Sequence, residues 1–276
     1  MKARTRLAIL GAGNIGCSIA RGLVQSGTFS VGNVLLTRRK MHLLQKLAEE
    51  GFVVESDNDN AVRSSDVVVV AVEPQQVNRL LKDITPALDR DKHTVISVVS
   101  DVSIRQIRTV IGKNMRIVRA MPNTAIAIRE SMTCLAADDR NSPEIGIAED
   151  IFKTVGRILV IDEEQMIAAT ALGACGVAFF LRAIRSASQG GIEIGFHADQ
   201  ALFIAAQTAR GAASLLLSME NHPEYEIDKV TTPRGCTIAG LNRMEHAGFS
   251  SALIRGIVSS AEKASKLYRA NENETT

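Results

Sequence analysis

Three glycines near the beginning of the chain have the spacing of a loop that approaches phosphate groups. Gly11, Gly13 and Gly16 form the pattern G-x-G-x-x-G, directly after the apolar run Leu7–Leu10 and at the start of a helical segment. The first glycine permits a tight turn, the second lets the backbone approach a pyrophosphate, and the third allows the helix to lie against the strand. The N–H groups at the N-terminus of that helix would then face the anion. A glycine-rich turn without a ligand is the alternative, but the agreement of strand, spacing and helix favours a dinucleotide site. Its expected residues are Gly11, Ala12, Gly13, Asn14, Ile15 and Gly16.

The residues after the second expected strand bear on which dinucleotide is bound. An NAD-selective site has Asp or Glu there, about twenty residues after the glycines, to bind the ribose 2′-OH. This chain instead has Thr37-Arg38-Arg39-Lys40, which offers cations and no carboxylate. These cations could be a solvated first turn of a helix, but their clustering favours a 2′-phosphate. We therefore assign Thr37, Arg38 and Arg39 to the cofactor site and expect NADP(H), with NAD(H) bound at lower affinity.

The elements that must position these residues alternate along the first 160 residues, where short β-branched runs are separated by helical patterns. This alternation is typical of βαβ units and a mostly parallel sheet. The run Val67–Val72 is apolar at every position, as expected for a strand covered by helices on both faces. The expected strands are Leu7–Leu10, Val34–Leu36, Val67–Val72, Thr94–Val99, Ile117–Ala120 and Arg157–Ile161, and Lys40–Glu50 is an expected helix. The predicted fold is α/β, with a Rossmann-like doubly wound domain.

After about Glu163 the sequence becomes rich in Ala and Leu at helical spacing and almost free of β-branched runs. We place a boundary there, with residues 1–162 as the NADP-binding Rossmann-like domain and residues 163–276 as an all-helical dimerisation and substrate domain. The expected helices are Glu164–Gly190, Asp199–Ser218, Thr237–Ala247 and Ser250–Ala270, followed by a polar, frayed tail at Asn271–Thr276.

One expected helix has little polar surface. The segment Ala201–Leu217 is nearly all apolar but contains Gln207, Thr208 and Arg210, so we expect a buried helix and not a membrane span. A helical half with so few polar residues is also poorly suited to a monomer. We therefore predict that it packs against a second copy of the chain.

Composition and charge argue against several classes of function. Thirty-two Lys and Arg against thirty Asp and Glu leave a net charge of +2 without a run of five like charges, so neither nucleic acid nor a membrane is an expected partner. The four cysteines form no C-x-x-C pair, which favours reduced thiols and a cytoplasmic protein over a disulfide framework. The five histidines form no metal-binding pair, so no metal is expected.

A set of motifs spread along the chain carries a family resemblance. The motifs are Ala71-Val72-Glu73-Pro74-Gln75, Met121-Pro122-Asn123-Thr124, Ser131-Met132-Thr133 and, most specific, Asp228–Leu241 followed by Glu245–Phe249. With them the chain resembles the pyrroline-5-carboxylate reductase family over essentially its full length. The resemblance implies an oxidoreductase that reduces L-1-pyrroline-5-carboxylate to L-proline with NADPH, in proline biosynthesis. It also implies a homodimer with interlocked helical domains, for which a decamer is a further possible assembly.

The resemblance implies residues for two sites. Cofactor contacts are implied for Asn58, Ala71, Val72, Pro74, Met121, Pro122 and Asn123. Substrate contacts are implied for Glu220, Thr232, Pro233, Gly235, Cys236 and Thr237. Thr237 would be the catalytic residue, presenting its hydroxyl to the imine nitrogen, while water or a solution-protonated iminium supplies the proton.

The loop of residues 231–237 also suits a small carboxylate when it is considered without the family. Pro233 and Gly235 interrupt one helix and the next begins near Thr237, so free N–H groups and hydroxyls would converge. A plain turn between helices with threonine caps is the alternative.

Three departures from the family's commonest pattern keep other functions open. Gly173–Phe179 replaces S-G-S-G-P-A-Y, Arg234 replaces a Gly after Pro, and Glu73 stands where Lys is common. The first two support a catalytically silent NADP-binding sensor or scaffold, against which the retained Glu220 and threonines argue. A β-hydroxyacid dehydrogenase is a weaker rival, because its chemistry needs a Lys in the helical half and Thr154–Asp228 contains none.

Overall fold

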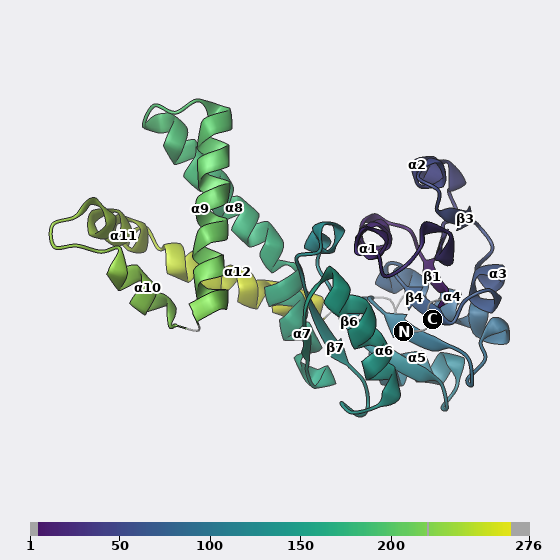
Figure 1. Ribbon diagram of the computed structural model, residues 1–276. Coiled ribbons are helices and arrows are strands. Elements are labelled where there is room, and N and C mark those ends of the chain that lie inside the picture. The colour runs from purple at the N-terminus through teal and green to yellow at the C-terminus, as the bar shows by residue number, and fades with distance from the viewer. Residues whose placement is uncertain (1–4, 220, 266–276) are drawn as a thin grey trace. The chain divides into compact units, whose positions relative to one another are not determined.

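Short apolar runs form one sheet of eight strands within the residues that the computed structural model describes, 5–219 and 221–265 (Figure 1). The strand order is β3-β2-β1-β4-β5-β6-β7-β8, and neighbours are parallel except for the antiparallel pair β6 and β7. The strands are β1 (Leu7–Leu10), β2 (Val34–Thr37), β3 (Val53–Glu55), β4 (Val67–Val70), β5 (Thr94–Ser97), β6 (Arg116–Met121), β7 (Ser131–Ala136) and β8 (Gly156–Val160). The predicted doubly wound, mostly parallel sheet is confirmed.

The central strands β1 and β4 are buried at every position because both faces of the sheet are covered. Alternate side chains of a strand point to opposite faces. Leu7 and Ile9 of β1 therefore join one apolar cluster, while Ala8 and Leu10 join the other. This two-sided burial is the reason that β4 can consist of four valines.

Helices contribute apolar residues to each of these clusters. Those of α1, α2 and α6 join the first cluster, and those of α3, α4 and α5 join the second. These helices are α1 (Asn14–Gln25), α2 (Gln45–Glu49), α3 (Asn58–Arg63), α4 (Pro74–Ile84), α5 (Ile104–Ile111) and α6 (Pro143–Phe152). Short 3-10 helices connect the elements: η1 (Val31–Asn33), η2 (Met41–Leu44), η3 (Thr85–Ala87), η4 (Thr124–Ile128), η5 (Lys153–Val155) and η6 (Glu163–Gln165).

Each of the six expected strands overlaps an observed strand, but β3 and β7 were not expected. β3 has only three residues and lies at the end of the sheet, where one neighbour defines it. β7 has the sequence SMTCLA, in which polar and apolar residues are mixed and β-branched residues are few. The expected helix Lys40–Glu50 is a 3-10 helix, η2, followed by the short α2. Local patterns were therefore sufficient for strands formed by apolar or β-branched runs and insufficient for the short β3 and the mixed sequence of β7.

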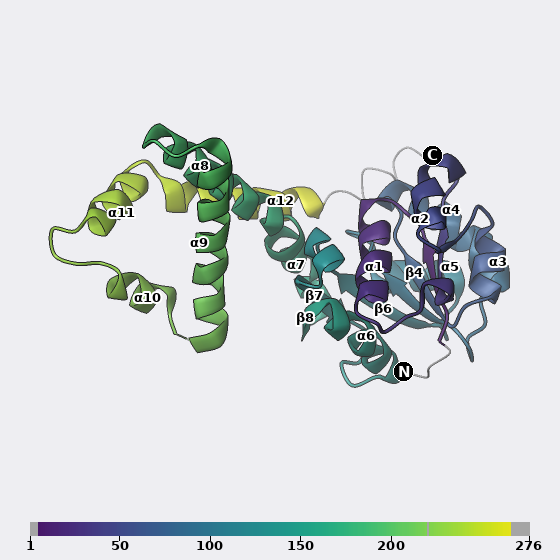
Figure 2. The same cartoon turned by 45° about the horizontal axis from the view of Figure 1, so that its top comes forward.

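The second part of the chain is helical, as expected, although its helices are divided differently. The expected helix Glu164–Gly190 is interrupted, because η6 and α7 (Met166–Ala169) are followed by a π-helix, η7 (Thr170–Ala174), before α8 begins. The further helices are α8 (Gly176–Glu193), α9 (Ala198–Met219), α10 (Pro223–Lys229), α11 (Cys236–His246) and α12 (Phe249–Ala264). Helices α8 and α9 lie side by side (Figure 2). The expected tail Asn271–Thr276 lies outside the described residues.

The expected buried segment Ala201–Leu217 is helical, but its own chain does not cover it. Only Ala201 of α9 is buried, whereas Phe203 is 73% exposed and Leu217 is 69% exposed. Within the described residues, Glu163–Glu193 and Ala198–Met219 are long and apolar enough to cross a membrane, by length and composition alone. An apolar helix needs a partner to cover it, and the partner predicted from the sequence is a second copy of the chain.

Two compact units divide the chain. Among the described residues, the first comprises 5–175 and 260–265, and the second comprises 176–219 and 221–259. The segment Glu163–Cys175, which sequence composition assigns to the helical half, thus has its contacts in the unit of the sheet. The carboxyl ends of β1 to β6 belong to the first unit, and the loop at Thr232–Thr237 belongs to the second.

Candidate cofactor and substrate sites

The glycine loop follows β1 and is shaped by the strand ends on either side of it. Gly11 has a φ of 99°, and a Cβ atom there would lie 2.7 Å from the carbonyl oxygen of Ala71. The N–H groups of Gly11 and Ala12 donate to the carbonyl oxygen of Thr37 at 3.2 and 2.9 Å. Both the backbone conformation and the close approach of β4 therefore require glycine at position 11.

The other two glycines of the loop have different surroundings. A Cβ atom on Gly16 would lie 2.7 Å from the carbonyl oxygen of Gly11, so glycine allows α1 to pack against the turn. A Cβ atom on Gly13 would meet nothing within 4 Å. Gly13 is also the N-cap of α1, and no side chain caps this helix. The N-terminus of α1 and the open side of Gly13 together form a place where a pyrophosphate could be bound.

The basic residues after β2 differ in how they are held. Arg38 is half-buried, and its Nη1 donates to the carbonyl oxygen of Ala12 at 3.0 Å, across the glycine loop. Arg39 is exposed. The hydroxyl of Thr37, which is buried, donates to Oδ1 of Asn58 at 2.6 Å and so joins the end of β2 to the start of α3. The structure thus brings Thr37, Arg38 and Asn58 to the same strand end as the glycine loop.

The remaining expected cofactor residues follow β4 and β6. Ala71 donates its N–H to the carbonyl oxygen of Leu10 at 2.8 Å, Val72 follows it, and Pro74 is the first residue of α4. Met121 ends β6, and Pro122 and Asn123 are buried directly after it. Because β1, β2, β4 and β6 are parallel, all these residues lie at the carboxyl edge of the sheet, where open α/β sheets bind ligands.

The carboxyl end of β5 belongs to the same edge, and the sequence prediction did not include it. Val98 donates its N–H to the carbonyl oxygen of Val70 at 3.0 Å, which places the residues after β5 beside those after β4. Ser100 and Asp101 follow, and Asp101 has a φ of 60°. The available signal was the change from the apolar run to Ser-Asp, since polar residues after a buried parallel strand face this edge.

The expected substrate loop lies in the second unit, between α10 and α11. The N–H of Gly235 donates to the carbonyl oxygen of Thr232 at 2.9 Å, which closes a turn with Pro233 and Arg234 at its centre. Helix α11 then begins at Cys236, with Gly235 as an N-cap that contributes no side-chain hydrogen bond. Thr237 is therefore in the first turn of a helix whose N-terminus is not capped by a side chain, which suits a carboxylate.

Glu220, an expected substrate contact, lies outside the described residues. Arg234 is exposed and has a φ of 61°, in the left-handed region that favours glycine. The glycine that is common at this position in the family suits that conformation, and Arg there costs about 1 kcal/mol of conformational free energy. A Cβ atom on Gly235 would lie 2.5 Å from Oγ1 of Thr232, so this second glycine is required by the turn itself.

The cysteines and acidic groups offer little other chemistry. Burial raises the pKa of the Cys17 thiol, although the charges of Arg21 and Arg38 oppose this shift. Burial also raises the pKa of Cys134. Neither thiol is therefore a ready nucleophile. Among residues 5–219 and 221–265, no group of three or more His, Cys, Asp or Glu residues could hold a metal ion.

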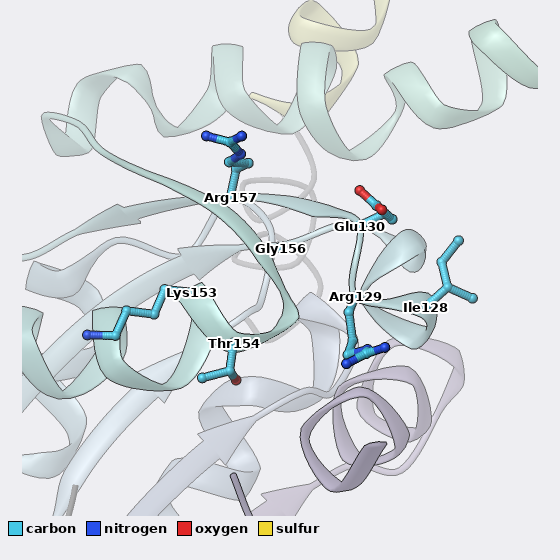
Figure 3. A pocket seen from close by; sticks show the side chains of 7 residues that line it. All are labelled: Ile128, Arg129, Glu130, Lys153, Thr154, Gly156 and Arg157. Atoms are coloured by element: carbon cyan, nitrogen blue, oxygen red, sulfur yellow. The ribbon is translucent and has the colours of Figure 1, made fainter. Parts of the chain in front are cut away.

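A hollow of about 370 Å³ lies near the beginnings of β7 and β8, lined by Ile128, Arg129, Glu130, Lys153, Thr154, Gly156 and Arg157. Its three cations point in different directions: Arg157 to one side, together with the carboxylate of Glu130, Arg129 to the opposite side, and Lys153 away from both (Figure 3). Lys153 is also paired with Asp150. Because these cations do not converge on one point, the hollow lacks the geometry of an anion site.

Two family profiles match this chain, one over each of its two parts. A family profile described as pyrroline-5-carboxylate reductase dimerisation matches residues 163–267, and one described as NADP oxidoreductase coenzyme F420-dependent matches residues 6–101. A solved pyrroline carboxylate reductase from Plasmodium falciparum, with NADP bound, has the same fold. Its TM-score is 0.86 at 23% identity, with 96% of this chain and 99% of that chain covered.

Two curated relatives come from Dictyostelium discoideum. Pyrroline-5-carboxylate reductase 1 is 53% identical over 95% of this chain, which spans only 50% of that relative's length. Pyrroline-5-carboxylate reductase 2 is 48% identical, with 96% of this chain and 94% of the relative covered. Identity of this extent, joined to the glycine loop and the loop before α11, shows that the chain belongs to the pyrroline-5-carboxylate reductase family.

Proposed function

We propose that the protein reduces L-1-pyrroline-5-carboxylate to L-proline, with NADPH as the hydride donor, in proline biosynthesis. The observation that carries the proposal is the similarity to pyrroline-5-carboxylate reductase 2 of Dictyostelium discoideum, which extends over 96% of this chain and therefore includes both candidate sites. The two sites supply the two binding functions that such a reaction needs: a dinucleotide loop, and an uncapped helix N-terminus for a small carboxylate.

The residues of the first unit fit NADP(H). The open side of Gly13 and the N-terminus of α1 suit the pyrophosphate, and Arg38 lies where a 2′-phosphate is expected. The similarity of residues 6–101 to an NADP oxidoreductase family supports this choice of cofactor. When bound, NADPH supplies the hydride, so the protein's own task is to bind, orient and exclude water. NAD(H) would lack the group that Arg38 and Arg39 bind and should have lower affinity.

The residues of the second unit would hold the substrate. The backbone N–H groups at the start of α11 would bind its carboxylate, and Thr232 adds a hydroxyl nearby. Thr237 would place its hydroxyl at the imine nitrogen and orient the ring. Addition of hydride to a neutral imine would produce an amide anion, so the nitrogen must receive a proton, either as a preformed iminium or from water. The contribution of the protein would then be mainly proximity and orientation.

We also propose that the chain forms a homodimer through its helical half, with interlocked helices and a decamer as the higher assembly. Exposed apolar side chains on α8, α9 and α12 support a dimer, among them Phe180, Leu181, Phe203, Leu217 and Ile254. The similarity of residues 163–267 to a dimerisation family supports it as well. Sedimentation velocity on the purified protein would test this assembly, and a monomer at micromolar concentration would contradict it.

The division into residues 1–162 and 163–276 is retained as a proposal about the two domains. It is supported by the start of the dimerisation similarity at residue 163, whereas the contacts of Glu163–Cys175 are with the sheet. Location in the cytoplasm is likewise a proposal, supported by four free cysteines.

The test of the proposed function is the initial rate of NADPH oxidation with L-1-pyrroline-5-carboxylate. It should be run beside NADH as the donor and beside an open-chain β-keto acid as the substrate. Turnover with the pyrroline alone, faster with NADPH, is the expected result. NADPH binding without turnover of any substrate would contradict the proposal and favour a sensor or scaffold. Turnover of the keto acid instead would favour a dehydrogenase of the β-hydroxyacid type.

A further inference from the structure

A buried ion pair joins the sheet to the segment that leads out of the first unit. Arg119 of β6 has a side chain only 6% exposed, and its Nη1 lies 3.2 Å from Oε1 of Glu163. Burial lowers the pKa of Arg119, and the carboxylate of Glu163 acts against this shift. An arginine remains charged even when its pKa is lowered, so a buried guanidinium needs this carboxylate nearby.

The same carboxylate oxygen has a second partner. Oε1 of Glu163 accepts a hydrogen bond of 2.7 Å from the N–H of Ile104, the first residue of α5. A carboxylate is favoured there by the partial positive charge of a helix N-terminus. One oxygen atom of Glu163, in η6, therefore contacts both β6 and α5. Arg119 of β6 is 44 residues from Glu163 along the chain, and Ile104 of α5 is 59 residues from it.

A second hydrogen bond holds the same segment at Gly173, ten residues after Glu163. Nδ2 of Asn123, just after β6, donates to the carbonyl oxygen of Gly173 at 3.2 Å. Gly173 belongs to the π-helix η7, in which Cys175 donates its N–H to the carbonyl oxygen of Thr170 at 2.9 Å. A π-helical turn inside a longer helix is uncommon and is often found at functional sites.

The contacts of Glu163 are directional. Nε of Arg119 is buried without a hydrogen-bond partner among the described residues, so the pair is not the most stabilising arrangement for this position. Apolar residues of similar volume often stabilise a protein as well as a buried ion pair does. A directional pair instead fixes where Glu163 lies relative to β6, and the second unit begins at Gly176, three residues after Gly173.

We propose that Glu163 is a positioning residue for hydride transfer. Together with Arg119, it clamps Glu163–Gly173 to β6 and so fixes the segment whose Gly173 holds the side chain of Asn123, an expected cofactor residue. The proposal rests on the proposed function, because it concerns the positions of the expected cofactor residues after β6. Reacting atoms must be held about 3 to 3.5 Å apart, and a displacement of about 1 Å can lower a rate about a hundredfold.

The test compares three variants of the full-length protein. Glu163→Ala removes both hydrogen bonds and the charge, whereas Glu163→Gln keeps an acceptor oxygen for Ile104 and removes only the charge. Glu164→Ala is the matched control, because Glu164 is the adjacent exposed carboxylate. The measurements are kcat, the Kd for NADPH, and the isotope effect on kcat with NADPH deuterated at the transferred position. Amide hydrogen exchange of residues 166–175 gives a readout independent of turnover.

With Glu163→Ala we expect kcat to fall about tenfold to a hundredfold and the Kd for NADPH to stay within about twofold. The isotope effect should rise, because a misaligned hydride transfer becomes rate-limiting, and exchange in residues 166–175 should accelerate. Glu163→Gln should lie between the wild type and Glu163→Ala, and Glu164→Ala should match the wild type.

Two results would overturn the proposal. One is an unchanged kcat in Glu163→Ala, and the other is a kcat that falls only in proportion to the folded fraction, with the isotope effect unchanged. A wild-type protein that binds NADPH but does not turn over the pyrroline would instead contradict the proposed function, and with it the role in hydride transfer. Hydrogen exchange would then show separately whether the clamp itself exists.

Discussion

The guanidinium of Arg38 reaches across the glycine loop and donates to the carbonyl oxygen of Ala12 at 3.0 Å. This contact fixes a positive charge at the end of β2, where the ribose 2′-phosphate is expected, whereas the next residue, Arg39, is exposed. The two arginines were predicted as a pair from their position after β2. The structure distinguishes them, since only Arg38 is tied to the loop, and cofactor preference should depend mainly on that residue.

Replacing Arg38 by Ala should weaken NADPH binding more than NADH binding. Loss of a charge-assisted hydrogen bond costs about 1.5 to 3 kcal/mol, which is roughly a tenfold to hundredfold increase in Kd for NADPH. The Kd for NADH should change much less, because NADH has no 2′-phosphate. Fluorescence titration of both cofactors measures the ratio, and Arg39→Ala should show a smaller effect. Equal changes for NADPH and NADH would mean that Arg38 only supports the loop.

Gly16 and Gly13 of the loop should respond differently to alanine. Gly16→Ala should lower the free energy of unfolding by about 1 to 3 kcal/mol, because its Cβ atom would lie 2.7 Å from a backbone oxygen. Gly13→Ala meets nothing within 4 Å and should leave that free energy nearly unchanged. It should nevertheless weaken NADPH binding, since the methyl group would occupy the open side of the turn. Urea denaturation and cofactor titration separate the two effects, and full NADPH affinity in Gly13→Ala would place the pyrophosphate elsewhere.

Thr237 should be important for turnover and unimportant for folding. It is partly exposed in the first turn of α11, and no side-chain hydrogen bond of that turn depends on it. Thr237→Ala should lower kcat at least about tenfold by removing one positioned hydrogen bond, with little change in Tm. Thr237→Ser keeps the hydroxyl and should recover most of the rate. If Thr237→Ala and the wild type have the same kcat, the hydroxyl takes no part in the reaction.

The parts of the structure that could be predicted from the sequence are those set by local patterns. The glycine spacing gave the turn after β1, and the valine run gave a strand buried on both faces, because each signal lies within about ten residues. The loop before α11 was also located, from Pro233 and Gly235. These features depend on backbone conformation and burial, which individual residue types report directly.

The missed features depend on contacts between distant segments. Arg119 and Glu163 are 44 residues apart, and Asn123 and Gly173 are 50 apart, so no local spacing connects them. Glu163 was placed at a domain boundary because composition changes there, yet its carboxylate is bound to β6 and α5.

His93 should make stability depend on pH. It is 1% exposed, and its Nδ1 accepts a hydrogen bond of 2.8 Å from the N–H of Asp89. Burial lowers the pKa of His93 below its usual value of about 6.5, and the charge of Lys92 adds to this, against smaller opposing effects of the backbone at Val62 and Ser65. Protonation of Nδ1 would also set two N–H groups against each other. The folded protein therefore keeps this side chain neutral at a pH where the unfolded chain protonates it.

The sign of the effect follows from this difference in proton binding. Above about pH 6.5 both states are neutral at His93 and its contribution to stability is complete. As the pH falls below 6.5, the unfolded state gains a proton that the folded state does not, so the free energy of unfolding decreases until the lowered pKa is reached. Urea denaturation between pH 7.5 and 5 should show this decrease in the wild type. It should be smaller in His93→Gln, whose amide oxygen can still accept from Asp89, and unchanged in His42→Gln, because His42 is exposed. An equal decrease in His93→Gln and the wild type would assign the acid sensitivity to other groups.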